Sequence, residues 1–420
     1  MLKNRSTIAL LVAELVSTSG IQMTFVALPW FVLVTTGSVT KMSYVLAAEV
    51  APMAIFGIPS GSVVSKLGGR RTMLAADLLR APLMVLVPVL HWTGALTLPL
   101  LLVVVFVLGL FSAPYFAAQR TIVPELYGSD ETVVSKAQAL FGGVSHLTLI
   151  IGPALGGLLV ASFGASAVLV VDACTYLFAF VVVLTLVQAG KPVPQDESSR
   201  GMLAGVRFLA RDRVLGPMTL SVIFLDACAA ALFTSLPALA FLRFDEDARV
   251  AGWLFTSLGI GALCGSILAM KLLERFRPLR LAGGAMVLAV LPLWLLVLTL
   301  PWEAVGVALF ACGLFLPLVN APAMGLLTTR PPEALRAKVM TAVLTASGIG
   351  APIGRVLVGP VYHAYGNAGV WIGIAGGMTV GAALFIGVAA RSSAGDAADV
   401  AAVAAVANRE PDPFADAARS

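Results

Sequence analysis

The stretch QAGKPVPQDESSRGMLAGVRFLARDR, residues 188–213, divides this chain into two apolar halves. No other segment before Arg391 is both long and hydrophilic. Each half contains six apolar runs of about 20 residues, and a run of about 18 or more can cross the hydrocarbon core as a helix. The pattern predicts an all-α membrane protein with twelve transmembrane helices in two six-helix lobes.

The composition excludes a large soluble domain. Hydrophobic residues make up 59% of the chain and charged residues only 12%, against about 25% charged residues in ordinary soluble proteins. The net charge of +5 does not indicate a nucleic-acid-binding protein, because the Lys and Arg residues occupy short turns between apolar runs. The four cysteines lie far apart within apolar runs. We therefore expect neither a zinc site nor a disulfide framework, and we expect no cofactor.

The hydrophilic break sets the domain organisation. We expect an N-terminal lobe over 1–189, a cytoplasmic linker over 190–213, a C-terminal lobe over 214–390 and a disordered cytoplasmic tail over 391–420. Apolar and basic residues segregate at helical spacing in the linker, which predicts an amphipathic helix on the membrane surface. The predicted spans are 6–34, 42–65, 72–92, 95–123, 134–163, 165–189, 214–242, 250–273, 279–300, 302–328, 337–363 and 366–390.

The loop charges predict the orientation. If Met1 is cytoplasmic, the loops on that side hold nearly all the Lys and Arg residues, and the outer loops hold only Lys41, Arg243 and Arg249. Cytoplasmic loops carry an excess of positive charge in membrane proteins. Both termini are therefore expected in the cytoplasm.

The two halves resemble each other weakly. Gly61-Ser62 ends the second predicted span, and Gly265-Ser266 lies in the eighth. Likewise Gly152-Pro153 in the fifth span corresponds to Ala351-Pro352 in the eleventh. Both offsets are about 200 residues, which indicates duplication of a six-helix unit. Such repeats hold a substrate site at their interface near mid-membrane.

The loop between the second and third spans reads GSVVSKLGGRR over residues 61–71. It resembles the signature loop of the major facilitator superfamily, G-x-x-x-D-R/K-x-G-R/K-R/K. The matching positions, with the basic residue that follows them, are Gly61, Lys66, Gly68, Arg70 and Arg71. The chain departs from this pattern at two positions, with Ser65 in place of the aspartate and Gly69 in place of a basic residue.

The fifth span carries a second resemblance to that superfamily. Gly152, Pro153, Gly156 and Gly157 resemble the antiporter motif of its drug exporters, although Thr148 stands where a further glycine is expected. Three further stretches resemble the branch with macrolide-efflux proteins and the enterobactin exporter. They are residues 27–38, residues 124–126 and residues 164–173.

These resemblances imply a function. They imply a proton antiporter that exports a hydrophobic or amphipathic small molecule by alternating access, spans a bacterial cytoplasmic membrane, and acts as a monomer. The chain contains no G-x-x-x-x-G-K-[ST] motif, so we do not expect ATP hydrolysis through a P-loop. An enzyme is disfavoured, because no clustered catalytic His, Cys or Ser motif occurs.

Other functions stay open at this point. A siderophore exporter or an importer of the same fold differs only in cargo or direction. A non-transporting membrane receptor or scaffold is a further alternative. The charged residues within the spans argue against the scaffold, because ionisable groups in a membrane are costly and mark functional sites.

Three carboxylates are candidates for proton coupling: Asp226, Glu14 and Glu49. Asp226 lies about 18 Å into the seventh span at 1.5 Å per residue, near the midplane. A carboxylate in apolar surroundings can take up a proton at physiological pH. Glu14 lies in the first span, which lines the cavity in the resembling family. For Asp77 with Arg80 a local pair is the favoured interpretation, because the two residues are three positions apart on one helix.

Asp172 is expected to bond structurally within its helix or to a neighbour.

Glu49 and Arg355 form a predicted gate. Each lies about 10–12 Å below the outer end of its helix, and in the resembling superfamily these two helices meet between the lobes. A carboxylate at equal depth would compensate a buried arginine. We expect an ion pair that closes the outer side, with bonding of each charge inside its own lobe as the alternative.

The expected cavity wall is aromatic and apolar, which suits a bulky cargo rather than a sugar or an amino acid. The candidate substrate contacts are Gln22, Met23, Phe25, Phe111, Tyr115, Phe224, Phe233 and Phe315.

Overall fold

The computed structural model describes residues 5–127, 131–188, 199–212, 214–276 and 278–407, and within these ranges every regular element is a helix. The elements are α1 (Arg5–Thr36), α2 (Val39–Leu67), α3 (Gly69–Trp92), α4 (Leu98–Tyr127), α5 (Glu131–Phe163), α6 (Ala165–Leu186), α7 (Ser199–Arg211), α8 (Leu215–Arg243), α9 (Ala248–Leu273), α10 (Pro278–Val290), the 3-10 helix η1 (Leu291–Val297), α11 (Trp302–Thr329) and α12 (Glu333–Ala407).

Eleven stretches of the described chain are long and apolar enough to cross a membrane. The last of them, Thr345–Val388, covers two of the predicted spans. Its helix breaks at Gly366, where φ is 67° and ψ is −167°. Glycine adopts this left-handed backbone without the steric cost that a Cβ would bring. The prediction of an all-α membrane protein is confirmed.

Two segments differ from the prediction. The ninth span is not one helix, because α10 passes into the 3-10 helix η1 at Leu291, next to Pro292. Proline removes a backbone donor and disrupts the α-helical turn before it. The helix α12 also continues through Ala407, although a disordered tail is predicted from residue 391. This extension is rich in alanine, which has the highest helix propensity. The rest of the tail lies outside the described residues.

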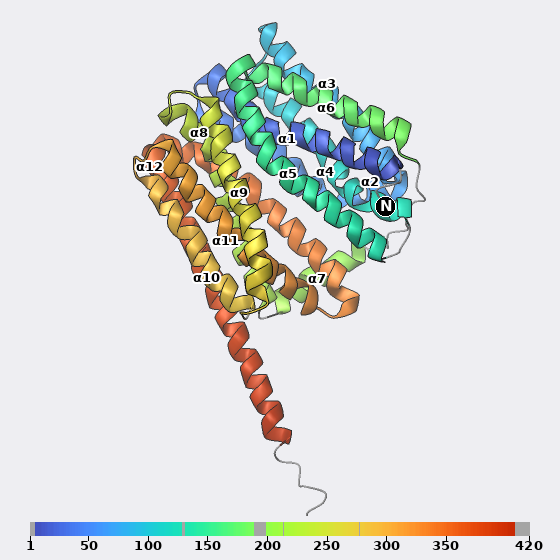
Figure 1. Ribbon diagram of the computed structural model, residues 1–420, viewed down its shortest axis with the longest axis vertical. Helices are drawn as coiled ribbons and strands as arrows, with labels where there is room; N and C mark the ends of the chain where they lie inside the picture. The colour runs from blue at the N-terminus through green and yellow to red at the C-terminus, as the bar shows by residue number, and fades with distance from the viewer. Residues whose placement is uncertain (1–4, 128–130, 189–198, 213, 277, 408–420) are drawn as a thin grey trace, which may run out of the picture.

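The helices form two bundles (Figure 1). The N-terminal lobe consists of α1 to α6, in which α1 packs on α5 and α6, and α4 packs on α2 and α3. The C-terminal lobe consists of α8 to α12, in which α8 packs on α12, and α11 packs on α9 and α10. The linker helix α7 contacts α12 and α8. The first part of the predicted linker lies outside the described residues.

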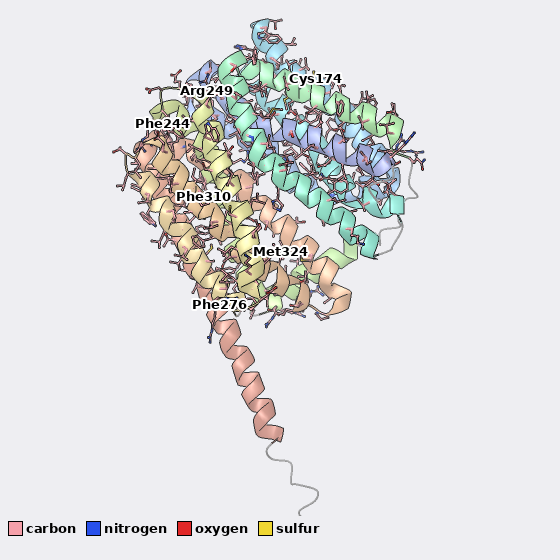
Figure 2. All side chains as sticks on the ribbon, viewed as in Figure 1. Cys174, Phe244, Arg249, Phe276, Phe310 and Met324 are labelled. Atoms are coloured by element: carbon pink, nitrogen blue, oxygen red, sulfur yellow. The ribbon has the colours of Figure 1, made fainter. Side chains whose placement is uncertain are left out.

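The molecule has two ends, which we name by their residues. The basic end holds Lys66 and Arg70, where α2 ends and α3 begins, and Arg330, where α11 ends. The opposite end holds the turn between α1 and α2. Figure 2 shows Phe276 at the basic end, close to where the extension of α12 leaves the bundle, and Phe244 at the opposite end.

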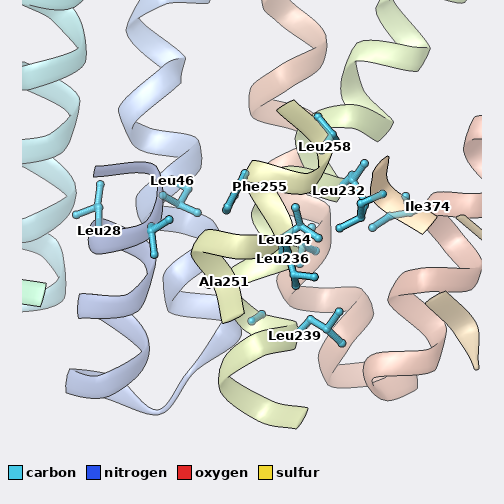
Figure 3. Close-up of a cluster of buried hydrophobic side chains, with 14 of the residues drawn as sticks. Leu28, Leu46, Leu232, Leu236, Leu239, Ala251, Leu254, Phe255, Leu258 and Ile374 are labelled. Carbon is cyan, nitrogen blue, oxygen red and sulfur yellow. The ribbon is translucent and has the colours of Figure 1, made fainter. Parts of the chain in front are cut away.

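The lobes are joined at the opposite end. One cluster of buried apolar side chains runs across both lobes there and includes Leu28, Leu46, Leu236 and Phe255 (Figure 3). A second cluster belongs to the N-terminal lobe alone, and its members lie toward the basic end, among them Ile122. The described residues therefore pack continuously between lobes at one end of the molecule, whereas the N-terminal lobe has its own core at the other.

Candidate functional site

A cavity of about 350 Å³ lies where α12 meets the N-terminal lobe. It is lined by Ile21, Thr24, Phe25, Glu49, Val50, Met53, Arg80, Met84, Leu108, Gly109, Ser112, Phe116, Gln119, Tyr176 and Arg355. All of these except Arg355 belong to the N-terminal lobe. Ligand pockets typically have volumes of about 300–1,000 Å³ and apolar walls with a few placed polar groups. The cavity matches that description.

An ion pair between the lobes lies in the cavity wall. Arg355 Nη1 lies 3.8 Å from Glu49 Oε2 and donates a hydrogen bond of 3.3 Å to the carbonyl oxygen of Leu46. Glu49 itself is positioned by a close approach of α2 to α4, since a Cβ on Gly109 would collide with the Glu49 carbonyl group. The structure thus brings together the two residues of the predicted gate, and it places both in the cavity wall.

Arg80 is the most deeply buried cation of the described residues, with 1% of its surface exposed. Its guanidinium carbon lies 4.1 Å from the ring centre of Tyr176 and 5.0 Å from that of Tyr115. Its Nη1 lies 3.6 Å from Asp77 Oδ1, one turn earlier on α3. Cation–π contacts strengthen when both partners are desolvated. Two aromatic rings and one carboxylate therefore hold Arg80 beside the cavity.

Glu14 lies directly behind the cavity wall. It is 1% exposed, and it accepts hydrogen bonds from Thr18 Oγ1 at 2.7 Å, from Tyr115 Oη at 3.5 Å and from Gln119 Nε2. Gln119 lines the cavity. The carboxylate is therefore separated from the cavity by one amide side chain.

Asp172 is fully buried on α6, the helix that also carries Tyr176. It accepts hydrogen bonds from Thr24 Oγ1 at 2.6 Å, from Tyr176 Oη at 3.1 Å and from Thr175 Oγ1 at 3.2 Å. A Cβ on Gly20 of α1 would collide with the side chains of Asp172 and Thr175. This bonding agrees with the expected structural role of Asp172 and also places it next to the cavity residues Thr24 and Tyr176.

The third predicted coupling residue lies elsewhere. Asp226 is half-buried in the C-terminal lobe on α8, with the Ser347 side chain of α12 as its hydrogen-bond partner. It is not among the residues that line the cavity. The structure therefore does not bring Asp226 together with Glu14 and Glu49.

The predicted substrate contacts are spread over several places. Phe25 lines the cavity. Tyr115 is buried beneath Arg80, and Phe233 stacks on Phe255 with ring centres 5.9 Å apart. Phe224 and Phe315 line separate pockets within the C-terminal lobe. The remaining three residues are buried or half-buried and do not line the cavity: Gln22, Met23 and Phe111.

The signature loop ties three helices together at the basic end. Gly68 has a φ of 81°, and the next amide, that of Gly69, donates to both carboxylate oxygens of Glu125 on α4 at 2.8 and 2.9 Å. Arg70 donates from Nε and Nη2 to carbonyl oxygens at the end of α6, at 2.7 and 2.8 Å. Arginine and an acidic side chain are favourable at helix C- and N-termini, respectively. Lys66 and Arg71 are exposed, and Gly61 is half-buried.

Glu125 lies beyond the apolar span of α4. Burial raises the pKa of Glu125, while the backbone amides of Gly69 and Arg70 act in the opposite direction. A Cβ on Gly69 would lie 3.1 Å from Glu125 Oε2 and 3.2 Å from a backbone carbonyl oxygen of α4. The close packing of α3 on α4 explains why a glycine suits the position where the family pattern has a basic residue.

The antiporter-like motif packs on two different partners. Gly152 and Gly156 face α1, where Cβ atoms on them would collide with or crowd Gln22 and Met23, respectively. Gly157 faces the other lobe, and its Cβ would lie 2.6 Å from the Ala248 carbonyl oxygen of α9. Small residues allow such close approach of membrane helices. Pro153 lies inside α5, and its carbonyl oxygen also faces α9.

Two contacts of this site are not predicted from the sequence. They are the position of Arg80 between two aromatic rings and the hydrogen bond from Gln119 to Glu14. One signal was available, because Asp172, Thr175 and Tyr176 are spaced i, i+3, i+4 and so share one face of α6. Among the described residues, no group of three or more His, Cys, Asp or Glu side chains has a geometry that could hold a metal ion.

The chain was compared with known proteins. Residues 10–355 and 222–408 match the family model of the Major Facilitator Superfamily. The multidrug efflux pump Tap of Mycolicibacterium fortuitum is 30% identical over 385 residues, which cover 87% of this chain and 91% of the relative. The enterobactin exporter EntS of Escherichia coli O1:K1 / APEC is 27% identical over 261 residues, 60% of each chain. The crystal structure of the nucleoside transporter NupG matches with a TM-score of 0.72 at 14% identity, covering 91% of this chain and 98% of that one.

Proposed function

Because this chain belongs to the major facilitator superfamily and is an efflux transporter of that superfamily rather than an enzyme, we propose that it exports amphipathic small molecules in exchange for protons. The observation that carries the proposal is the cavity, where a carboxylate and two guanidinium groups line one space among apolar side chains.

The cavity wall supports an amphipathic cargo. Phe25, Met53 and Phe116 offer apolar and aromatic surface, while Arg80 and Glu49 offer charge. Aromatic and thioether side chains adapt to differently shaped apolar ligands. A cargo with an apolar body and one polar group would use both parts of the wall. The similarity to multidrug efflux pumps supports drug-like molecules as that cargo.

Buried carboxylates support proton coupling. Glu49 lies in the cavity wall opposite Arg355, and Glu14 lies one side chain behind the wall. A carboxylate that becomes protonated no longer attracts a guanidinium group. Protonation of Glu49 would therefore release Arg355 and loosen the tie between α2 and α12. Asp226 lies outside the cavity. Substitution of Asp226 is therefore the comparison for substitutions of the cavity carboxylates.

The packing between lobes supports alternating access. The lobes share a buried core at the opposite end, where Trp30 and Phe241 have ring centres 5.4 Å apart. The Thr256 hydroxyl of α9 also donates to the Ile150 carbonyl oxygen of α5 at 3.1 Å. With the basic end in the cytoplasm, as the excess of positive charge favours, this arrangement corresponds to a state closed to the outside. Both termini would then be cytoplasmic.

A siderophore is the second candidate cargo. Arg80 and Arg355 both line the cavity, and guanidinium groups bind carboxylates and other planar anions well. The similarity to an enterobactin exporter supports the same class. The two candidates differ in the chemical class of the cargo, a lipophilic drug or a metal-chelating siderophore, and one experiment separates them.

The test is transport by the purified protein in proteoliposomes with an imposed pH gradient. Ethidium, erythromycin and iron-free enterobactin serve as probes for a lipophilic cation, a bulky macrolide and a catechol siderophore. We expect uphill movement of ethidium or erythromycin that a protonophore abolishes. Uphill movement of enterobactin alone would favour the siderophore, and movement that survives the protonophore would contradict proton antiport.

A further inference from the structure

The buried charges of the N-terminal lobe do not balance. Apart from the Glu49–Arg355 ion pair in the cavity wall, Arg80 shares the lobe interior with Glu14, Asp77 and Asp172, each no more than 1% exposed. An ionised carboxylate that is buried without a partner is costly, so such a group takes up a proton instead. One cation cannot neutralise three carboxylates, and hydrogen bonds decide which of them stay ionised.

Hydrogen-bond donors separate Asp77 from the other two carboxylates. Glu14 and Asp172 each accept from three side-chain donors. Both carboxylate oxygens of Asp77 are buried and have no hydrogen-bond partner among the described residues. Donors stabilise the ionised form of a carboxylate. Asp77 is therefore the least stabilised anion of the three, and its one charged contact is Arg80, at 3.6 Å.

Arg80 connects Asp77 with the cavity. Its Nε and Nη1 lack hydrogen-bond partners within the described part of the chain, and its side chain also lines the cavity. A guanidinium group has five N–H donors. Arg80 is thus held by ring faces and one loose ion pair, an arrangement that leaves its donors free to change partners.

The groups that face Arg80 come from six elements, its own helix α3 and five neighbouring helices. Asp77 is on its own helix, Tyr115 is on α4, and Asp172 and Tyr176 are on α6. Glu14 on α1 is bonded to Tyr115, while Glu49 on α2 and Arg355 on α12 share the cavity wall with Arg80. A change of charge on Asp77 would therefore act on the whole wall through one side chain.

We propose that Asp77 is a proton-binding group of the transport cycle and that Arg80 is the positioning residue that couples it to the cavity. This inference rests on the proposed proton antiport. A proton from cavity water adds to one carboxylate oxygen of Asp77 and later leaves from the carboxyl group, and no other bond changes. While Asp77 is ionised it holds Arg80, and when it is neutral Arg80 turns its donors to the cavity.

The first test uses the Asp77→Asn variant, which keeps the shape of the side chain and removes its proton binding. In proteoliposomes, uphill ethidium efflux driven by a pH gradient should be lost completely, while exchange of ethidium down its own gradient should continue at a rate close to that of the wild type. Glu303→Gln, an exposed substitution in the first turn of α11, is the control and should change neither rate. Uphill efflux at the wild-type rate in Asp77→Asn would overturn the proposal.

The second test does not depend on any cargo. Infrared difference spectra of the purified protein in lipid, recorded between alkaline and acidic pH, detect the carbonyl stretch of carboxyl groups that become protonated. One such band should be missing in Asp77→Asn and present in Glu303→Gln. An unchanged set of bands in Asp77→Asn would overturn the proposal. If the wild-type protein transports none of the probes, the proposed antiport is refuted. The infrared result then decides by itself whether Asp77 binds a proton.

A third variant keeps the proposal testable if Asp77→Asn does not reach the membrane. Asp77→Glu keeps a carboxyl group and moves it by one methylene, so it should restore gradient-driven efflux in part and shift the pH at which the efflux rate is half-maximal. A purely structural role would leave that pH unchanged. An unshifted pH profile in a folded Asp77→Glu protein would therefore count against Asp77.

Discussion

The two lobes are related by sequence but differ in what they bury. The interior of the N-terminal lobe contains Glu14, Asp77, Arg80 and Asp172, bonded to one another through hydroxyl groups and aromatic rings. The described interior of the C-terminal lobe buries hydroxyl groups that bond to their own helix backbones, and its one buried charge is Arg355. The buried ionisable groups therefore lie mainly in one half of the molecule.

The C-terminal lobe has close backbone contacts, as the N-terminal lobe does at Gly109 and Gly156, but without a buried polar network beside them. Cβ atoms on Gly261, Gly265 and Gly313 would each collide with the backbone of the facing helix in the α9–α11 pair. Gly354, next to Arg355, contacts the backbone of α8 in the same way. Small residues of this kind give rigid packing without any polar group. The comparison suggests a lobe that binds cargo and protons and a lobe that moves against it as a rigid body.

The largest effect is expected from Arg80→Leu. This change leaves three buried carboxylates without a buried cation, and removing one partner of a buried charge pair costs about 3–5 kcal/mol. Thermal unfolding in detergent should show a large loss of stability. Asp226→Asn keeps the shape of a half-buried side chain in the C-terminal lobe, so it should lose far less stability than Arg80→Leu. Equal losses in the two variants would remove the difference between the lobes.

The next effect concerns the contact between lobes at Gly157. The variant Gly157→Ala places a Cβ 2.6 Å from the Ala248 carbonyl oxygen, so α5 and α9 must move apart and the opposite end should open. The measurement is labelling of Thr40→Cys at that end by a membrane-impermeant thiol reagent. Gly142→Ala on the same helix is the matched control, because its Cβ would meet no atom within 4 Å. Identical labelling in both backgrounds would show that this contact does not close the outer side.

A charge swap tests the tie between the lobes. Glu49→Arg and Arg355→Glu should each reduce gradient-driven efflux, because each leaves two like charges side by side in the cavity wall. The double variant restores an opposite pair and should recover part of the lost transport, which a double-mutant cycle measures as coupling between the two sites. Strictly additive losses would argue against direct pairing.

The smallest effect is expected at the linker, outside the membrane. Asp212 Oδ1 accepts the amide N–H groups of Val214 and Leu215 at 2.8 Å, and Oδ2 accepts from Arg330 Nε at 3.2 Å. Burial acts to raise the pKa of Asp212, but these amides and the guanidinium outweigh it and hold that pKa below its ordinary value. Loss of such a helix-capping side chain costs about 1 kcal/mol.

The sign of the pH dependence follows from the lowered pKa of Asp212. The stabilisation is present above the pKa of an unfolded aspartate and is lost as the pH falls through the lower pKa of the folded state. Asp212→Asn should therefore lower the thermal unfolding temperature at neutral pH and have less effect at acidic pH. Asp245→Asn, in the exposed turn after α8, is the control. A difference that grows toward acidic pH would contradict this role.

The sequence predicts the architecture well because the signal is strong in each segment alone. Long apolar runs, the break at 188–213 and the glycines of the fifth span are local features, and each corresponds to a feature of the structure. The approach of Glu49 to Arg355 is also predicted, because both side chains lie at one depth on helices that meet in the resembling family.

The buried network is not predictable in the same way. Arg80 meets Tyr176, and Glu14 meets Gln119, across about 100 residues of chain. Such contacts depend on how each helix is rotated about its axis. In a membrane helix that is apolar on every face, hydrophobic periodicity does not reveal that rotation. The helical extension through Ala407 was missed for a different reason, since the Ala- and Asp-rich composition of the tail suggested disorder, whereas the propensity of alanine favours a helix.

The most direct test of the difference between the lobes is the number of protons that cross the membrane for each ethidium molecule transported, measured in proteoliposomes. We predict the wild-type number for Asp226→Asn in the C-terminal lobe. We predict no coupled proton flux for the double variant Glu14→Gln with Asp77→Asn in the N-terminal lobe. Loss of coupled flux in Asp226→Asn, with normal flux in the N-terminal double variant, would contradict the account.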